Sequence, residues 1–189
     1  MDYRLVLVNK DNKIEDNFIE KVNLIKVKDV NDEEILVEKE TYEAYIDLRN
    51  FLYNKNIIIG LSSGYRSLEH QQRVYNNFVE RYGLDYAKKV VAPVGCSEHH
   101  TGLAIDIDIS VDGNFLSSNI DLMEHEDVYL EIHKYLHKFG FILRYMKGKE
   151  DITGYPYEPW HLRYVGNIAP DIYLSNLTLE EYFEKNFTN

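Results

Sequence analysis

Two short polar segments of the chain carry the residue types that metal-dependent hydrolysis needs. Residues 97–106 place His99 in a predicted loop and Asp106 on a predicted strand, and the tetrapeptide Glu-Pro-Trp-His places Glu158 and His161 at the start of another strand. Two histidines and one carboxylate form a ligand set of catalytic Zn²⁺, whose fourth position stays open for water. A carboxylate close to the ligands, here Glu158, can then act as the general base.

Each segment also has a purely structural interpretation. His99 and Asp106 fit a surface loop and a solvated carboxylate equally well. Glu158 and His161 stand three positions apart, and in a regular strand that spacing points two side chains to opposite faces. Pro159 keeps its segment out of a helix, so an irregular strand start would let both side chains converge. The zinc hypothesis therefore requires the two segments to meet at one cavity.

Arg66 is the third candidate, because it lies between a β-branched run and a predicted helix. Its guanidinium can stabilise a carbonyl oxygen on which negative charge develops, or it can hold a substrate carboxylate. The alternative is an ion pair with an acidic surface residue, which would contribute little to stability.

Two other groups offer weaker chemistry. His133 and His137 have the i, i+4 spacing of zinc-peptidase helices, but Lys134 stands where the general base would be. We therefore predict ordinary surface histidines near the edge of the apolar stripe of a helix. The single cysteine, Cys96, lies near His99, and we predict a small, half-buried thiol beside the site rather than a nucleophile.

Composition excludes several classes of function. The 189 residues fit one domain, predicted to span residues 1–189. A net charge of −11 disfavours nucleic-acid phosphates and anionic lipids as partners. The sequence has no run of about 18 apolar residues, so it predicts no membrane span. The lone cysteine, and the absence of an apolar signal-peptide core of about 7–15 residues near the first residue, favour a cytoplasmic location.

The elements that must position these residues are mixed helices and strands. Residues 103–109 alternate, so that three isoleucines face one side of a strand while Asp106 and Asp108 face the other. No strict strand–helix–strand rhythm is present, which predicts an α+β fold with a small central antiparallel sheet flanked by helices. We predict strands at 5–8, 22–25, 35–37, 57–59, 103–109, 141–145 and 160–165, and helices at 41–54, 67–82, 124–138 and 178–184.

With these motifs in place, the chain resembles the zinc D-alanyl-D-alanine peptidases, the VanX, VanY and VanXY group, with their L,D-carboxypeptidase relatives. The pattern Ser-x-His-x-x-Gly-x-Ala-x-Asp followed by Glu-Pro-Trp-His is specific, and the resemblance covers about residues 5–182. Further matching stretches are 5–10, 63–67 with Gln71, 95–99, 139–145 and 152–155. The sequence Gly-Cys-Ser-Glu-His at residues 95–99 and the lack of a leader are most similar to VanXY proteins.

The resemblance implies a Hedgehog/D,D-peptidase-like fold and zinc held by His99, Asp106 and His161. It further implies that Glu158 is the catalytic base and that Arg66 stabilises the tetrahedral oxyanion. These metal, base and arginine roles coincide with those reached from the residue types themselves.

Substrate contacts follow from the same resemblance. Gln71 and Ser97 match positions that help to hold the end of the substrate, and Tyr65, in the motif of Arg66, is added as a substrate-binding residue. The implied partners are D-Ala-D-Ala and the stem peptide of peptidoglycan precursors, cleaved by a monomer or homodimer, with a link to vancomycin resistance. Two alternatives stay open: an L,D-carboxypeptidase acting on tetrapeptides, and a catalytically silent zinc-binding module. The segment 146–153 is expected to border the pocket that decides between substrates.

Overall fold

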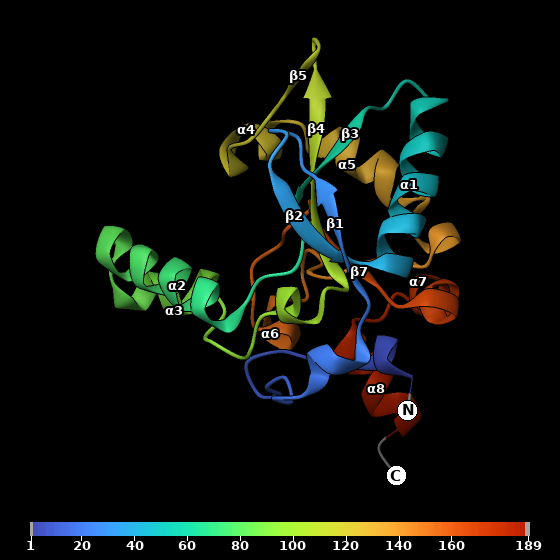
Figure 1. Ribbon diagram of the computed structural model, residues 1–189. Helices are drawn as coiled ribbons and strands as arrows, with labels where there is room; N and C mark the ends of the chain where they lie inside the picture. The colour runs from blue at the N-terminus through green and yellow to red at the C-terminus, as the bar shows by residue number, and fades with distance from the viewer. Residues whose placement is uncertain (1, 188–189) are drawn as a thin grey trace.

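An antiparallel sheet forms the centre of the molecule (Figure 1). The computed structural model describes residues 2–187, and the sheet has 5 strands, in the order β3-β4-β7-β6 with β5 paired to β4. The strands are β3 (Ile59–Ser63), β4 (Ala104–Val111), β5 (Asn114–Phe115), β6 (Phe141–Leu143) and β7 (His161–Tyr164). A separate hairpin pairs β1 (Leu24–Lys28) with β2 (Glu34–Glu38). All strand pairs are antiparallel, which confirms the predicted α+β class.

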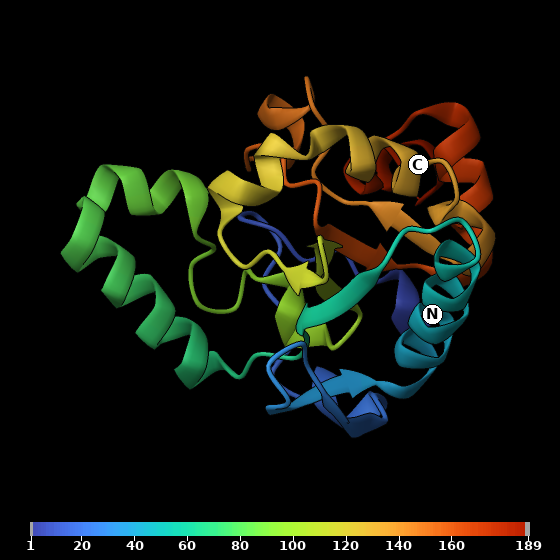
Figure 2. The same cartoon turned by 90° about the horizontal axis from the view of Figure 1, so that it is seen from above.

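Helices flank this sheet, and one pair of helices projects from the body of the molecule. They are α1 (Lys39–Tyr53), α2 (Leu68–Tyr82), α3 (Leu84–Val90), α4 (Asn119–Glu124), α5 (Glu126–His133), α6 (Glu150–Thr153), α7 (Ala169–Ser175) and α8 (Leu179–Phe187). Figure 2 shows α2 and α3 as the projecting hairpin, away from α1 and the sheet. Within residues 2–187, none of the helices has the length and apolar character that crossing a bilayer requires.

The alternation along β4 divides the sheet into an apolar and a polar face. Ile105, Ile107 and Ile109 are buried in the main core, together with Leu48 of α1 and Ile132 of α5. The predicted alternation is therefore correct, and it leaves the aspartates of β4 on the face away from the core. A second, smaller cluster joins β6 to α7 and α8.

Two predicted elements are wrong. Residues 5–8 are not a strand: a 3-10 turn covers Tyr3–Leu5, and Arg163 Nη2 donates to the carbonyls of Arg4 (3.0 Å) and Val6 (2.7 Å) in place of a strand partner. The predicted helix 124–138 is broken, because α5 ends at His133 and a 3-10 turn follows.

Core packing predicts the cost of a truncation in α1. Leu48 is fully buried, so Leu48→Ala is expected to lower the free energy of unfolding by about 2–5 kcal/mol through lost contacts and a cavity. Leu130→Ala in α5 is the matched control, because Leu130 is 52% exposed and the change should cost less than about 0.5 kcal/mol. Denaturant melts measure both, and equal effects would contradict the placement of the core.

Candidate active site

The centre of the site is a cross-strand pair on the polar face of the sheet. Asp106 of β4 lies directly opposite His161 of β7 in the register. Opposed residues of an antiparallel pair project from the same face and come within contact distance. The Asp106 carboxylate and His161 Nδ1 are accordingly 2.9 Å apart.

His99 reaches the same carboxylate from a loop. A 3-10 turn covers Glu98–Thr101 and ends at Gly102, whose φ of 72° favours glycine. His99 Nε2 lies 3.3 Å from Asp106 Oδ2, while its Nδ1 lies 2.7 Å from the carbonyl oxygen of Gly64. A Cβ on Gly64 would collide with the backbone of Leu36, so the close packing of this loop requires glycine.

The donor set fits a zinc ion. One ligand atom each of His99, Asp106 and His161 lies within 4.8 Å of the other two. Zn–N distances of about 2.0–2.1 Å in a tetrahedral site put neighbouring ligand atoms about 3.4 Å apart, so small side-chain shifts suffice. The carbonyl of Gly64 fixes the orientation of His99, as the outer partner of a metal-binding imidazole does.

Glu158 joins this site because the chain turns before β7. The amide of His161 donates to the carbonyl of Glu158 (3.2 Å), and Pro159 and Trp160 occupy the two central positions of this turn. The turn supplies the irregular strand start that convergence of Glu158 and His161 requires. Burial raises the pKa of Glu158 to about 7, even though His161 and Arg66 oppose the shift.

One polar cavity of about 220 Å³ collects most of the predicted site residues. Its lining includes Arg66, Gln71, Ser97, His99, Asp106, Glu158 and His161. Arg66 Nη1 donates to Gln71 Oε1 (3.0 Å), and Gln71 Nε2 donates to the carbonyl of Ala92 (2.7 Å). Gln71 is therefore engaged in holding Arg66 in place. Burial lowers the pKa of Arg66, while the nearby Asp106 and Glu158 carboxylates favour its charged form.

Tyr65 and the segment 146–153 lie apart from the cavity. Tyr65 lines a different hollow, together with Leu68 and His100, although it neighbours Arg66 in sequence. The side chains of the successive residues Tyr65 and Arg66 line different cavities, so their shared motif does not place them at one site. Met146 lines an apolar cavity, and no residue of 146–153 lines the catalytic one, which corrects the expectation for this segment.

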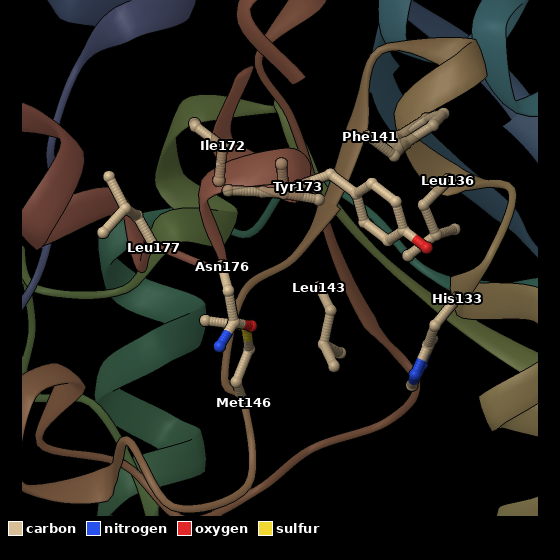
Figure 3. Close-up of a pocket in the computed structure, with 10 residues that line it drawn as sticks. His133, Leu136, Phe141, Leu143, Met146, Ile172, Tyr173, Asn176 and Leu177 are labelled. Carbon is tan, nitrogen blue, oxygen red and sulfur yellow. The ribbon is translucent and has the colours of Figure 1, made fainter. Parts of the chain in front are cut away.

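The rival sites show no catalytic arrangement. His133 lies at the rim of the apolar cavity (Figure 3), with its Nε2 2.9 Å from the carbonyl oxygen of Pro159. The ring of His137 stacks on Tyr173, with centroids 4.0 Å apart. Among the described residues, neither histidine belongs to a group able to hold a metal. Cys96 is buried and its thiol faces the carbonyl of Lys10 at 3.9 Å.

Glu98 is a site residue that the motifs did not single out. Its side chain is fully buried, and its Oε1 accepts from Arg144 Nε (2.7 Å) and Arg163 Nη1 (2.6 Å). Its Oε2 lies 3.6 Å from His161 Nε2, and these two buried atoms have no other partner. Glu98 therefore faces the imidazole nitrogen that is turned away from the metal ligands. Its neighbours Ser97 and His99 are polar, so the local sequence carries no signal that Glu98 is buried.

This arrangement is that of a metal-dependent hydrolase, because one cavity holds a three-ligand centre, a base with a raised pKa and the half-buried cation of Arg66. The comparisons agree. The family model described as "VanY: D-alanyl-D-alanine carboxypeptidase" matches residues 34–167. The chain therefore belongs to this family of zinc peptidases.

Individual relatives are similar over most of the chain. The bifunctional D-Ala-D-Ala dipeptidase and carboxypeptidase VanXYC of Enterococcus gallinarum is 38% identical over 67% of this chain and 66% of its own length. VanY from a VanB-type resistance cassette, solved with Zn(II), has a TM-score of 0.79 at 31% identity and covers 96% of this chain and 99% of its own. The LD-carboxypeptidase LdcB has a TM-score of 0.79 at 37% identity, covering 96% and 86%. The chain spans 66–67% of the length of three curated relatives and 46% of a fourth, a D-alanyl-D-alanine carboxypeptidase of Enterococcus faecium.

The contact between Glu98 and His161 predicts an effect on metal binding. Glu98→Gln removes the charge that the outer nitrogen of His161 faces, and we expect zinc affinity to fall about 10–100-fold. Competition with a chromogenic chelator measures the affinity of the folded protein. Glu131→Gln is the control, because Glu131 pairs with Lys134 at the surface. Wild-type zinc affinity in folded Glu98→Gln would contradict the positioning role.

Proposed function

We propose that the chain hydrolyses the terminal D-Ala from D-Ala-D-Ala peptides of peptidoglycan precursors. The observation that carries this proposal is the meeting of His99, Asp106 and His161 with Glu158 and Arg66 at one cavity. Membership of the carboxypeptidase family supplies the reaction class. The presence of both Glu158 and Arg66 argues against a catalytically silent zinc-binding module.

The chemistry follows from the positions of these side chains. Zinc held by the three ligands would polarise the scissile carbonyl and lower the pKa of a water molecule to about 7. Glu158 takes a proton from the attacking water and returns it to the leaving amine as the C–N bond breaks. The Arg66 guanidinium offsets the negative charge that develops on the carbonyl oxygen. Gln71 holds Arg66 by the 3.0 Å hydrogen bond and so fixes the direction of its donors.

Substrate choice between D,D- and L,D-peptides depends on the part of the cavity that contacts the residue before the scissile bond. Activity on D,D-peptides is supported by the family model and by the similarity to VanXYC, which is both a dipeptidase and a carboxypeptidase. The L,D alternative is supported by the likeness to LdcB. Release of D-Ala from the dipeptide, a pentapeptide stem and a tetrapeptide, assayed side by side, distinguishes them: release from the tetrapeptide alone would overturn the D,D proposal.

Further parts of the proposal concern the protein as a whole. We propose one catalytic domain, residues 1–189, acting as a monomer or homodimer in the cytoplasm, where the lone cysteine stays reduced. Removing terminal D-Ala from cell-wall precursors would remove the peptide end that vancomycin binds. Light scattering tests the oligomeric state, and cell fractionation tests the location. The vancomycin resistance of cells that express the protein tests the link to the antibiotic.

The base assignment predicts a separation between metal content and turnover. Glu158→Gln is expected to retain zinc, because Glu158 is outside the ligand set, and to lower kcat by about 10²–10⁴-fold through loss of general base catalysis. Metal analysis and initial rates on D-Ala-D-Ala measure the two effects. Undiminished kcat would exclude Glu158 as the base.

The raised pKa of Glu158 predicts the acid limb of the pH profile. The carboxylate must be deprotonated to accept a proton, so kcat/KM should fall as pH falls through this pKa, which burial raises to about 7. The charge of a bound metal ion favours the carboxylate, so the limb lies at or below about pH 7. Profiles of wild type and Glu158→Gln check this: the same limb in the residual activity of the variant would assign it to another group.

A further inference from the structure

A second polar cavity adjoins the catalytic one. It has a volume of about 280 Å³ and shares Asp106, Asn119 and Trp160 with the catalytic cavity. The rest of its lining is mostly hydroxyl, amide and carboxyl groups: Asn31, Ser62, Ser63, Asp108 and Ser117, with Leu122. A peptide bound at the metal centre can therefore continue into a second polar space.

Asp108 is the charged group of this second cavity. It is only 5% exposed and projects from the same face of β4 as Asp106, two residues away. The register of β3 and β4 shifts between Leu61 and Ser63, which leaves Ser62 unpaired as a bulge that lines the same cavity as Asp108. Bulges beside active sites re-aim side chains in this way.

No cation of the described chain neutralises Asp108. Within residues 2–187, no lysine, arginine or histidine forms an ion pair with its carboxylate, and burial and the carboxylates of Asp106 and Asp29 raise its pKa. It also belongs to no group able to hold a metal ion in this part of the chain. A buried carboxylate without a cation is costly, so a bound ligand that supplies the positive charge would be favoured.

The two cavities differ in their charged side chains. Arg66 and Glu158 line only the first cavity, and Asp108 lines only the second. Asp106 lines both, so the second cavity begins at the metal-binding centre. Asp106 and Asp108 are two residues apart along β4, which corresponds to about 6.5 Å, and an extended peptide covers that distance with about two residues. Asp108 is thus within reach of a group one or two residues before the scissile bond.

We propose that Asp108, with Ser62, forms a subsite for a primary ammonium group on the amino-terminal side of the scissile bond. This proposal rests on the proposed peptidase function and refines its substrate class. The ammonium has two possible sources: the free amino terminus of a dipeptide, or the side chain of a basic residue that precedes the terminal D-Ala-D-Ala. Both place one positive charge in the second cavity.

Matched substrates distinguish the two sources. One pair is D-Ala-D-Ala and N-acetyl-D-Ala-D-Ala, and the other is N-acetyl-Lys-D-Ala-D-Ala with a free or an acetylated side-chain amine. For the zinc-loaded wild-type protein, we expect kcat/KM for the free amine to exceed that for its acetylated form about 10-fold or more in one pair. The pair that shows the preference identifies the source. Equal values within both pairs would overturn the proposal, whether or not any variant folds.

Asp108→Asn tests the residue itself. The ratio of the free to the acetylated substrate should fall about 10-fold toward unity, mainly through KM, because the amide cannot neutralise an ammonium. Asp112→Asn is the control: it makes the same chemical change at the exposed turn after β4, and its ratio should match wild type. A wild-type ratio in Asp108→Asn would refute the assignment. Absence of D-Ala release from every substrate would instead overturn the proposed function, and this subsite with it.

Discussion

A buried ion cluster around Glu98 is the constraint on which the arrangement of the site depends. Glu98 binds Arg144 of the segment after β6 and Arg163 of β7, and Arg144 in turn binds Glu180 of α8. Two positive and two negative charges balance one another, and the Arg144 and Arg163 cations hold the pKa of Glu98 well below its usual range. Removing one partner of such a cluster costs about 3–5 kcal/mol, because an uncompensated charge stays buried. The loop that carries His99 is thereby fixed to the strand that carries His161.

The same cluster connects the ends of the chain to the catalytic sheet. Arg163 also donates to the carbonyls of Arg4 and Val6, and Glu180 accepts from Asn9 (3.0 Å). The amino-terminal segment is therefore held against β7 and α8 by hydrogen bonds, without forming a strand of the sheet. Asp106 of β4 and His161 of β7 share one face, so a slip of β4 by one residue would turn its aspartates toward the core and its isoleucines away from it. Stability and catalysis depend on one alignment.

How far the sequence predicted this structure depends on the range of the interactions involved. The alternation around Asp106 and the boundaries of α2 are local patterns, and both were predicted correctly. The ligand set could also be proposed, because residue types and motif spacing were informative. The role of Glu98 could not, because it requires Arg144 and Arg163, which are distant in sequence. Four apolar residues at 5–8 indicate a strand, whereas Arg163, distant in sequence, binds the carbonyls of Arg4 and Val6 instead.

Tyr145 contacts both the base, Glu158, and the metal ligand His161, and so holds them in a fixed relative position. Its ring stacks on His161 with centroids 4.9 Å apart, and the guanidinium of Arg144 lies 5.1 Å from the ring centroid. Its carbonyl accepts the amide of Glu158 (3.2 Å). One residue thus contacts the ligand through its side chain and the base through its backbone, while its neighbour, Arg144, anchors it to Glu98. This position therefore favours an aromatic ring, because the π-face of Tyr145 packs against both an imidazole and a guanidinium group, which an aliphatic side chain cannot do.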